Sequence, residues 1–375
     1  MKIVTIIGAR PQIIKASALS RAIKEHFTQS IKEIIVHTGQ HYDENMSEVF
    51  FKELNIPSPN YNLGVKSASH GVQTAKMIVG IEEILLQEKP NAIVLYGDTN
   101  STLAGAIAAA KIHVPIVHIE AGLRSFDKNM PEEINRIMCD NVSTLLFSPT
   151  LAGYNNLIRE GFSQNISSQP DFNHPNIYHC GDIMLDNTLF FKQIAQQNES
   201  FQHKYGKDFI LCTIHRNANT DNKNKLSSIF RSLLRINHKI ILPLHPRTKK
   251  MMPIMLDKYL FSEVMQSENI EIIEPVSYLA MTYLENNCSL VITDSGGVQK
   301  EAYYMSKPCI ILRPETEWVE IVQTGNAIIA DTDEDKIVAS ANKFLNSKSL
   351  NPFIALFGNG RAAEFMCQTM LNCLG

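Results

Sequence analysis

Carboxylates follow short apolar segments at several points in the first half of this chain of 375 residues. Asp98 comes two residues after Ala92–Tyr96, and Glu120 comes directly after Ile116–Ile119. Glu132 follows a short way along the chain. Several convergent carboxylates are what general acid/base catalysis needs, and removal of a proton from carbon benefits from a second, differently tuned carboxylate. The pattern therefore indicates an acid/base site.

Each of these carboxylates also has a structural interpretation. Asp98 is placed to cap the helix that follows it, and so are Thr99 and Ser101. Glu132 suits the first turn of a helix and stands four residues before Arg136, a spacing that favours an ion pair. Taken singly, these motifs leave both interpretations open.

A glycine-rich turn in the second half indicates phosphate binding. The apolar segment Leu290–Thr293 leads through Asp294 into Ser295-Gly296-Gly297, which opens a helical pattern. Two glycines let a ligand approach the backbone closely, and the free N–H groups and dipole of a helix start attract phosphate. Glu301 follows within two helical turns, where it can accept the two hydroxyls of a ribose. The turn therefore predicts a site for a nucleoside diphosphate.

Basic residues at other segment ends add candidate phosphate contacts. Arg10 precedes a helix start, a place that suits a cation only if an anion is bound beside it, and Lys15 lies one turn further. The alternative for Arg10 is an exposed pair with a surface carboxylate. Further candidates are His215, which is an acid/base or phosphate partner, and the cations Arg247 and Arg313. The first segment end lacks the GxGxxG pattern, so we expect no nicotinamide cofactor.

The apolar segments predict the elements that must position these residues. They are short and do not alternate, which is typical of strands buried on both faces of a parallel sheet with helical crossovers. The expected strands are Lys2–Ile7, Glu33–His37, Ala92–Tyr96, Ile116–Ile119, Leu145–Ser148, Phe209–Thr213, Lys239–Pro243, Glu271–Glu274, Leu290–Thr293, Cys309–Leu312 and Asn326–Ala330.

The length and order of these strands predict two Rossmann-like α/β domains with a central cleft. We place the first domain at residues 1–175, ending in a polar loop at 163–175, and the second at 176–360. The last helix, within 361–375, is expected to pack back on the first domain. Ligands of open α/β sheets bind beyond the carboxyl ends of the strands, where the candidate residues lie.

Composition excludes several classes of protein. Hydrophobic residues make up 44% and charged residues 19%, and the net charge is −3 without a basic block, so we expect a globular protein that does not bind nucleic acid. No apolar run approaches ~18 residues and no charged leader precedes one, so we expect a cytoplasmic protein without membrane association. The seven cysteines show no CxxC pair, which favours buried thiols over a zinc site or a disulfide framework.

Together these motifs resemble the non-hydrolysing UDP-N-acetylglucosamine 2-epimerase family over nearly the whole chain. The resemblance rests on eight motifs in order: Gly8–Pro11, Thr38–His41, Gly97–Thr99, His118–Arg124, Pro131–Arg136, His215-Arg216, Thr293–Gly297 with Glu301, and Thr316-Glu317. It implies a glycosyltransferase-B-like fold, a homodimer, a UDP-sugar substrate and a reaction without a nicotinamide or metal cofactor. UDP would be eliminated to leave a 2-acetamidoglucal and then added back with C2 inverted.

The resemblance also implies roles for individual residues. The acid/base carboxylates of the family fall on Asp98, Glu120 and Glu132, without showing which removes the C2 proton, and its histidine falls on His215. Its nucleotide contacts fall on Arg10, Ser295, Gly296, Gly297 and Glu301.

Departures from the simple family pattern bear on the sugar. Many UDP-N-acetylglucosamine epimerases carry Thr and Glu where this chain has Ala9 and Gln12, and the form seen here, with Thr316–Glu320, looks more like the branch that acts on 2,3-diacetamido uronic acid sugars. Gln40 and His41 match part of a region where a second UDP-sugar activates some members. A hydrolysing relative that releases UDP and N-acetylmannosamine, a glycosyltransferase on the same scaffold and an inactive UDP-sugar-binding module are the alternatives.

Overall fold

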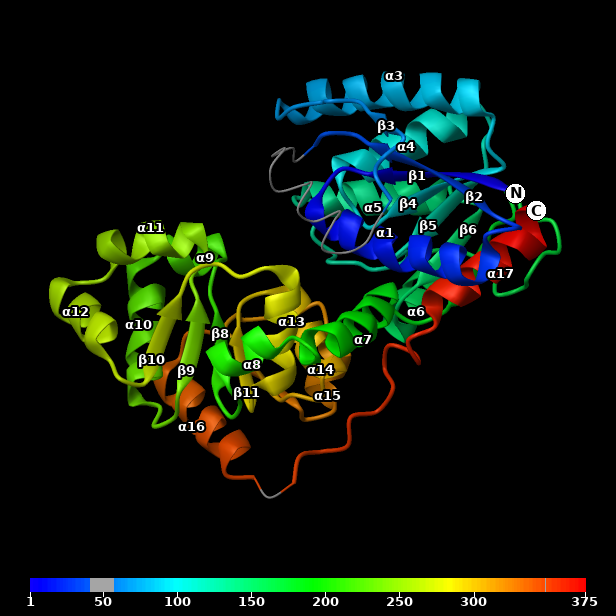
Figure 1. Ribbon diagram of the computed structural model, residues 1–375. Coiled ribbons are helices and arrows are strands. Elements are labelled where there is room, and N and C mark those ends of the chain that lie inside the picture. The colour runs from blue at the N-terminus through cyan, green and yellow to red at the C-terminus, as the bar shows by residue number, and fades with distance from the viewer. Residues whose placement is uncertain (41–56, 348) are drawn as a thin grey trace. The chain divides into compact units, whose positions relative to one another are not determined.

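The computed structural model describes residues 1–40, 57–347 and 349–375, so His41 lies outside the described residues. These residues form two compact units, one of residues 1–187 and 356–375 and one of residues 188–355. Each unit is a parallel sheet covered by helices (Figure 1). The division falls within helix α7 (Ile183–Gln196).

The first unit is built on a parallel sheet of seven described strands in the order β3-β2-β1-β4-β5-β6-β7. Its strands are β1 (Lys2–Ile7), β2 (Lys32–His37), β3 (Tyr61–Asn62), β4 (Ala92–Tyr96), β5 (Ile116–Ile119), β6 (Leu145–Ser148) and β7 (Asn176–His179). The chain reverses its direction across the sheet between β1 and β4, which pair directly, and such a switch point is where open α/β sheets bind ligands.

Helices cover both faces of this sheet. The described helices are α1 (Arg10–Ala22), the π-helical turn η1 (Ile23–Phe27), α3 (His70–Glu88), α4 (Asn100–Lys111), α5 (Pro131–Asn141), α6 (Leu151–Arg159) and α17 (Ala362–Leu374). Side chains of α3, α4 and α5 share one apolar core with β1, β2 and β4. α1 and α17 pack together on the opposite face, as Figure 1 shows.

The second unit is a parallel sheet of six described strands in the order β10-β9-β8-β11-β12-β13. These are β8 (Ile210–Thr213), β9 (Ile240–Pro243), β10 (Ile270–Ile273), β11 (Leu290–Thr293), β12 (Cys309–Ile311) and β13 (Ala327–Ile329). Its helices are α8 (Glu199–Tyr205), α9 (Asn217–Thr220), α10 (Lys223–Arg235), α11 (Pro246–Met255), α12 (Lys258–Gln266), α13 (Tyr278–Asn287), α14 (Gly296–Tyr304), α15 (Val319–Gln323) and α16 (Glu334–Leu345). Here the switch point lies between β8 and β11.

All eleven predicted strands are present within one residue at each end, because each is a buried apolar segment. Two strands were missed. β3 has only two residues, and β7 carries polar residues at the edge of the sheet. Because β7 pairs with β6, the first sheet extends beyond residue 175, and the units divide after Asn187 rather than at the predicted position.

The C-terminal helix belongs to the first unit. Asp186 of α7 accepts hydrogen bonds from the first backbone N–H groups of α17, those of Ala362 at 3.2 Å and Ala363 at 2.8 Å. Asp186 thereby caps a helix that is remote from it in sequence. Within the described ranges, no helix is both long and apolar enough to cross a membrane.

Candidate functional site

The turn after β1 lies at the switch point of the first sheet and leaves no room for a side chain at Gly8. A Cβ there would lie 2.1 Å from Ser101 Oγ and 2.2 Å from Thr38 Oγ1. Gln40 completes this cluster, because its Oε1 accepts hydrogen bonds from the backbone N–H of Ser101 at 3.0 Å and from Ser101 Oγ at 2.7 Å. The Gly8 turn is therefore packed directly on the start of α4.

Gln12 fixes the same turn from within helix α1. Its Oε1 accepts the backbone N–H groups of Gly8 and Ala9 at 2.9 and 3.1 Å. Its Nε2 donates to the carbonyl of Tyr96 at 2.9 Å and to Thr102 Oγ1 at 3.0 Å. A buried amide can serve both sets of partners, whereas a carboxylate could not donate to the carbonyl of Tyr96. Gln12 therefore couples the ends of β1 and β4.

Asp98 follows β4 and does not cap the helix after it. Thr99 is the cap, and its hydroxyl accepts the N–H of Thr102 at 3.3 Å. Asp98 instead forms an ion pair with Arg136 of α5. Burial raises the pKa of Asp98, the Arg136 charge opposes that rise, and Glu120 adds to it. This is the environment of a group that can exchange a proton.

Glu120 stands beside Asp98 in an unusual backbone conformation. Its φ of +77° lies in the left-handed region, which a non-glycine residue adopts only where the surroundings enforce it. Its carboxylate forms an ion pair with Lys15 of α1. Lys15 was predicted as a phosphate contact, and the structure places it within the carboxylate cluster. Lys15, Asp98, Glu120 and Arg136 thus alternate in charge at the ends of β4 and β5.

A buried network of hydrogen bonds and ion pairs supports the turns that carry this cluster. His118 donates to Asp140 Oδ1 at 2.7 Å and to the carbonyl of Gly97 at 2.8 Å, and both partners are acceptors, so both ring nitrogens carry protons. The other oxygen of Asp140 accepts the N–H of Gly122 at 3.1 Å and pairs with Arg124 at 2.7 Å. The His118–Arg124 motif therefore acts mainly as support for the turns that carry Asp98 and Glu120.

Glu132 and Glu133 differ although they are neighbours at the start of α5. Glu133 is buried and accepts the N–H groups of Ser125 and Phe126 at 2.9 and 3.0 Å. Burial opposes its ionisation, but these bonds and Arg136 hold its pKa below the usual value. Glu132 is exposed, and the sequence-suggested pair with Arg136 does not form, because Arg136 binds Glu133 and Asp98.

In the second unit, Asp294 organises the turn after β8. It is fully buried at the end of β11, and it accepts the N–H of His215 at 3.0 Å, that of Arg216 at 3.0 Å and Nδ2 of Asn219 at 3.0 Å. The imidazole of His215 lies beside that of His245, with ring centroids 5.3 Å apart. Burial lowers the pKa of His215, and Asp294 opposes that shift. The lowered pKa favours the uncharged imidazole of His215 at neutral pH.

The Ser295-Gly296-Gly297 turn forms the N-terminus of α14, as the sequence predicted. Ser295 is the cap, with its hydroxyl 3.5 Å from the N–H of Val298, so the N–H groups of both glycines precede the helical hydrogen bonds. Trp318 contacts the turn, and its Nε1 donates to the carbonyl of Gly296 at 2.9 Å. The predicted ribose contact, Glu301, lies on the same helix and is half-buried.

The other predicted cations occupy different settings. Arg10 is the exposed first residue of α1. Arg247 pairs with Asp221. Arg313 forms two hydrogen bonds with Glu317, each 2.9 Å. Sequence reasoning did not single out Arg216, yet a Cβ on Gly296 would lie 3.8 Å from Arg216 Nη2. The signal was its position beside His215, at the strand that adjoins β11 at the switch point.

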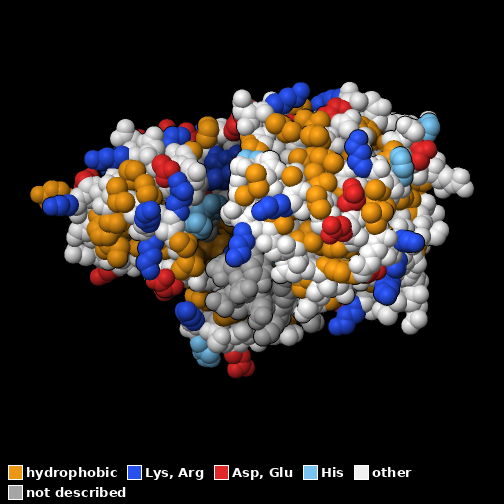
Figure 2. All heavy atoms as spheres, turned by 90° about the horizontal axis from the view of Figure 1, so that it is seen from above, with side chains coloured by type: hydrophobic (Ala, Val, Ile, Leu, Met, Phe, Trp, Pro, Cys, Tyr) orange, Lys and Arg blue, Asp and Glu red, His pale blue; other side chains and the backbone are white. Residues whose placement is uncertain are grey.

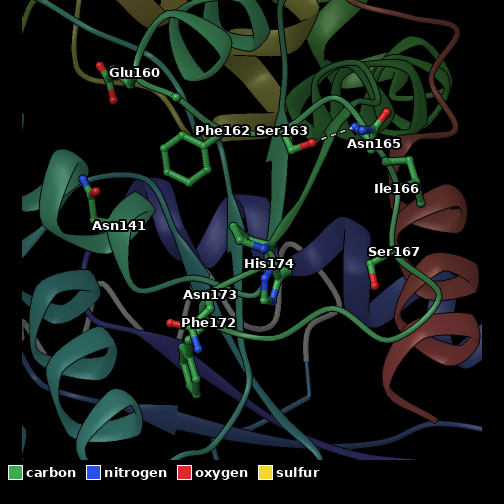
Figure 3. A pocket seen from close by; sticks show the side chains of 12 residues that line it. Asn141, Glu160, Phe162, Ser163, Asn165, Ile166, Ser167, Phe172, Asn173 and His174 are labelled. Carbon is green, nitrogen blue, oxygen red and sulfur yellow. Dashed lines mark hydrogen bonds between the residues drawn. The ribbon is translucent and has the colours of Figure 1, made fainter.

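A separate pocket in the first unit contains none of the predicted site residues. It measures about 520 Å³ and is lined largely by the polar loop at 163–175, including Phe172 and His174, together with Phe162 (Figure 3).

The two parallel sheets, each with polar side chains at its switch point, and the strand–Ser-Gly-Gly–helix turn define an α/β enzyme that handles a phosphorylated ligand. A sequence model of the UDP-N-acetylglucosamine 2-epimerase family matches residues 22–371. The chain belongs to this family, and it is a 2-epimerase.

Individual relatives agree over the full length. The UDP-2,3-diacetamido-2,3-dideoxy-D-glucuronate 2-epimerase of Pseudomonas aeruginosa is 48% identical, covering 97% of this chain and 98% of that protein. A UDP-N-acetylglucosamine 2-epimerase homolog of Methanococcus maripaludis is 46% identical, covering 99% and 100%. The crystal structure of the Methanocaldococcus jannaschii UDP-GlcNAc 2-epimerase in complex with UDP-GlcNAc and UDP matches with a TM-score of 0.83 at 42% identity, covering 99% of each chain.

Proposed function

We propose that this enzyme inverts C2 of a UDP-linked 2-acetamido sugar by elimination and re-addition of UDP. A base removes the proton from C2 while the bond between C1 and the diphosphate oxygen breaks, which leaves a 2-acetamidoglucal and UDP. The diphosphate oxygen then re-forms its bond to C1, and C2 receives a proton on the opposite face. No net oxidation occurs, and the proton lost in the first half is replaced in the second.

The charge-alternating cluster of Lys15, Asp98, Glu120 and Arg136 carries this proposal. Abstraction and return of a proton on opposite faces need two acid/base groups, and Asp98 and Glu120 are adjacent carboxylates whose charges interact. Their present partners are lysine and arginine side chains, which can shift toward other anions. Glu132, exposed at the start of α5, is the third candidate.

The second unit supplies most of the groups proposed to hold the leaving group. The N-terminus of α14 at Ser295-Gly296-Gly297 suits the diphosphate, and Glu301 suits the ribose hydroxyls. Arg10, Arg247 and Arg313 are the proposed further cations for the phosphates. The neutral imidazole of His215, whose pKa burial lowers, can donate a hydrogen bond to the departing diphosphate oxygen.

An NMR assay tests the reaction and the sugar together. We expect conversion of UDP-N-acetylglucosamine, of its 2,3-diacetamido uronate analogue, or of both, with solvent deuterium incorporated at C2. A product without deuterium at C2 would exclude proton exchange. Release of free UDP in step with turnover would instead identify a hydrolysing enzyme, and activity only with an added acceptor would identify a glycosyltransferase.

Substitutions test the proposed division of labour. Asp98→Asn, Glu120→Gln and Glu132→Gln should each abolish epimerisation while UDP still binds, because most of the proposed diphosphate contacts lie in the second unit. Activity close to wild type in any of these variants removes that residue from the mechanism.

The apolar surface of the first unit supports a homodimer. On α3, Val72, Val79 and Leu86 recur every seven residues and are 50%, 59% and 56% exposed. On α5, Ile134 and Met138 are also exposed. Figure 2 shows hydrophobic side chains gathered on the face that carries α3. Such a stripe favours pairing with the same surface of a second copy. Val79→Glu should convert the dimer to a monomer in sedimentation equilibrium, and a monomeric wild type would contradict this proposal.

We also propose a cytoplasmic location and a role in polysaccharide biosynthesis. Cell fractionation would test the first, and loss of a surface polysaccharide on deletion of the gene would test the second.

A further inference from the structure

Glu285 is a buried acid that the proposed reaction does not use. It lies on α13, which packs against α14, and its side chain is almost fully enclosed, with the residue 2% exposed. Among the residues that the structure describes, no lysine or arginine forms an ion pair with it, and its Oε1 has no hydrogen-bond partner. A buried carboxylate without a cation is strongly disfavoured, so a neutral form is expected.

The carboxyl group of Glu285 forms a hydrogen bond with the side chain of Glu301 on α14. Two ionised carboxylates offer only acceptors, so this contact requires a proton on one of them. Glu285 is the more deeply buried of the two, since Glu301 is half-buried, and the proton therefore resides on Glu285. Burial is the main cause that raises the pKa of Glu285 well above its usual value, and the charge of Glu301 adds to it.

The helix α14 fixes the distance between Glu301 and the Ser295-Gly296-Gly297 turn. Glu301 lies five residues after Gly296 on the same helix, which corresponds to about 8 Å along the helix axis. That separation suits a ribose joined to a diphosphate at the helix start. A flexible glutamate would lose side-chain entropy on binding two hydroxyls, whereas one already held by a neighbour loses less.

We propose that Glu285 is a positioning residue, a neutral carboxylic acid that donates a hydrogen bond to Glu301 and fixes the Glu301 carboxylate for the vicinal hydroxyls of a nucleoside diphosphate. This inference rests on the proposed function, in which Glu301 receives the ribose. Glu285 does not touch the ligand itself, and it acts through the orientation and the charge of Glu301.

Binding of UDP compared with 2′-deoxy-UDP tests the proposal by calorimetry on the full-length protein. A carboxylate that accepts the 2′-hydroxyl should give the wild type a preference of roughly 10- to 100-fold for UDP. Glu285→Gln keeps a hydrogen-bond donor and should retain that preference. Glu285→Leu removes the donor and should reduce it to about threefold or less, as should the control Glu301→Gln. Circular dichroism and the fluorescence of Trp318, which contacts α14, report whether each variant is folded.

The outcomes separate this inference from the function on which it rests. A wild type that binds neither nucleotide contradicts the proposed function. A wild-type preference that survives in Glu285→Leu, or one that is lost equally in Glu285→Gln, overturns the role of Glu285 alone. If Glu285→Leu does not fold, ¹³C NMR of the glutamate carboxyls decides, because the wild type at pH 7 should show a neutral carboxylic acid signal that Glu285→Gln removes. Absence of that signal overturns the proposal.

Discussion

Asp186 should make the docking of helix α17 depend on pH. The residue is 8% exposed, and although it accepts two N–H groups of α17, burial raises the pKa of its carboxyl to about 6 from a usual value of 3.8. The folded state therefore binds the proton more tightly than the open state. The favourable contribution is complete below pH 3.8 and is lost as the pH rises through 6.

The expected size follows from these two values. A rise of about two pKa units corresponds to about 3 kcal/mol in total, of which about 1.3 kcal/mol is lost between pH 5 and pH 7. Asp186→Asn cannot ionise, so its own contribution stays constant over this range. Other groups titrate equally in both proteins, and the difference between wild type and variant isolates Asp186.

Hydrogen exchange of the α17 peptide, residues 362–374, measures the opening free energy of this helix. Relative to Asp186→Asn, the wild type should lose close to tenfold in protection from pH 5 to pH 7, after correction for intrinsic exchange rates. Trp318, the single tryptophan, lies in the other unit, so the urea midpoint of its fluorescence should be the same in both proteins. A difference between the two proteins that does not change with pH would refute the reasoning.

Three further substitutions have expected outcomes. Gly8→Ala should destabilise the first unit by at least about 2 kcal/mol in urea unfolding, because the new Cβ would lie 2.1 Å from Ser101 Oγ, whereas the same change at an exposed glycine should have little effect. Asp140→Asn should cost about 3–5 kcal/mol because it removes the carboxylate that pairs with the fully buried His118, whereas Arg124 keeps its pair with Glu160, and an unchanged midpoint would contradict this. Trp318→Phe should weaken UDP binding several-fold in calorimetry by releasing the first turn of α14, and an unchanged affinity would show that the indole hydrogen bond is dispensable.

The fold could be predicted from the sequence because its strands are buried on both faces. Segments such as Leu290–Thr293 are buried along their whole length and mostly apolar, which is typical of strands in a parallel sheet covered on both faces. β7 was not predicted because two of its residues are polar. Without β7, the first domain was predicted to end too early, at residue 175. The cap of Asp186 on α17 joins residues far apart in sequence, so no local pattern could reveal it.

Sequence motifs located the candidate acids, but they did not show which acid does what. Asp98 was predicted as an acid, whereas Asp140 and Asp294, which also lie in or near recognisable motifs, were not, and only their contacts distinguish the three. Asp140 and Asp294 use both oxygens on backbone N–H groups and buried side chains, so neither can change partners without disturbing a turn. An acid so satisfied is part of the scaffold.

The carboxylates that remain suited to chemistry are those whose partners are long cationic side chains. Asp98 pairs with Arg136 and Glu120 pairs with Lys15, and a charged substrate can replace one member of such a pair without disturbing the backbone of a turn. In the second unit, Glu301 shares a hydrogen bond with another carboxylic acid, Glu285. The type of partner, which a single sequence does not reveal, therefore separates the acids that shape this enzyme from those expected to act on its ligand.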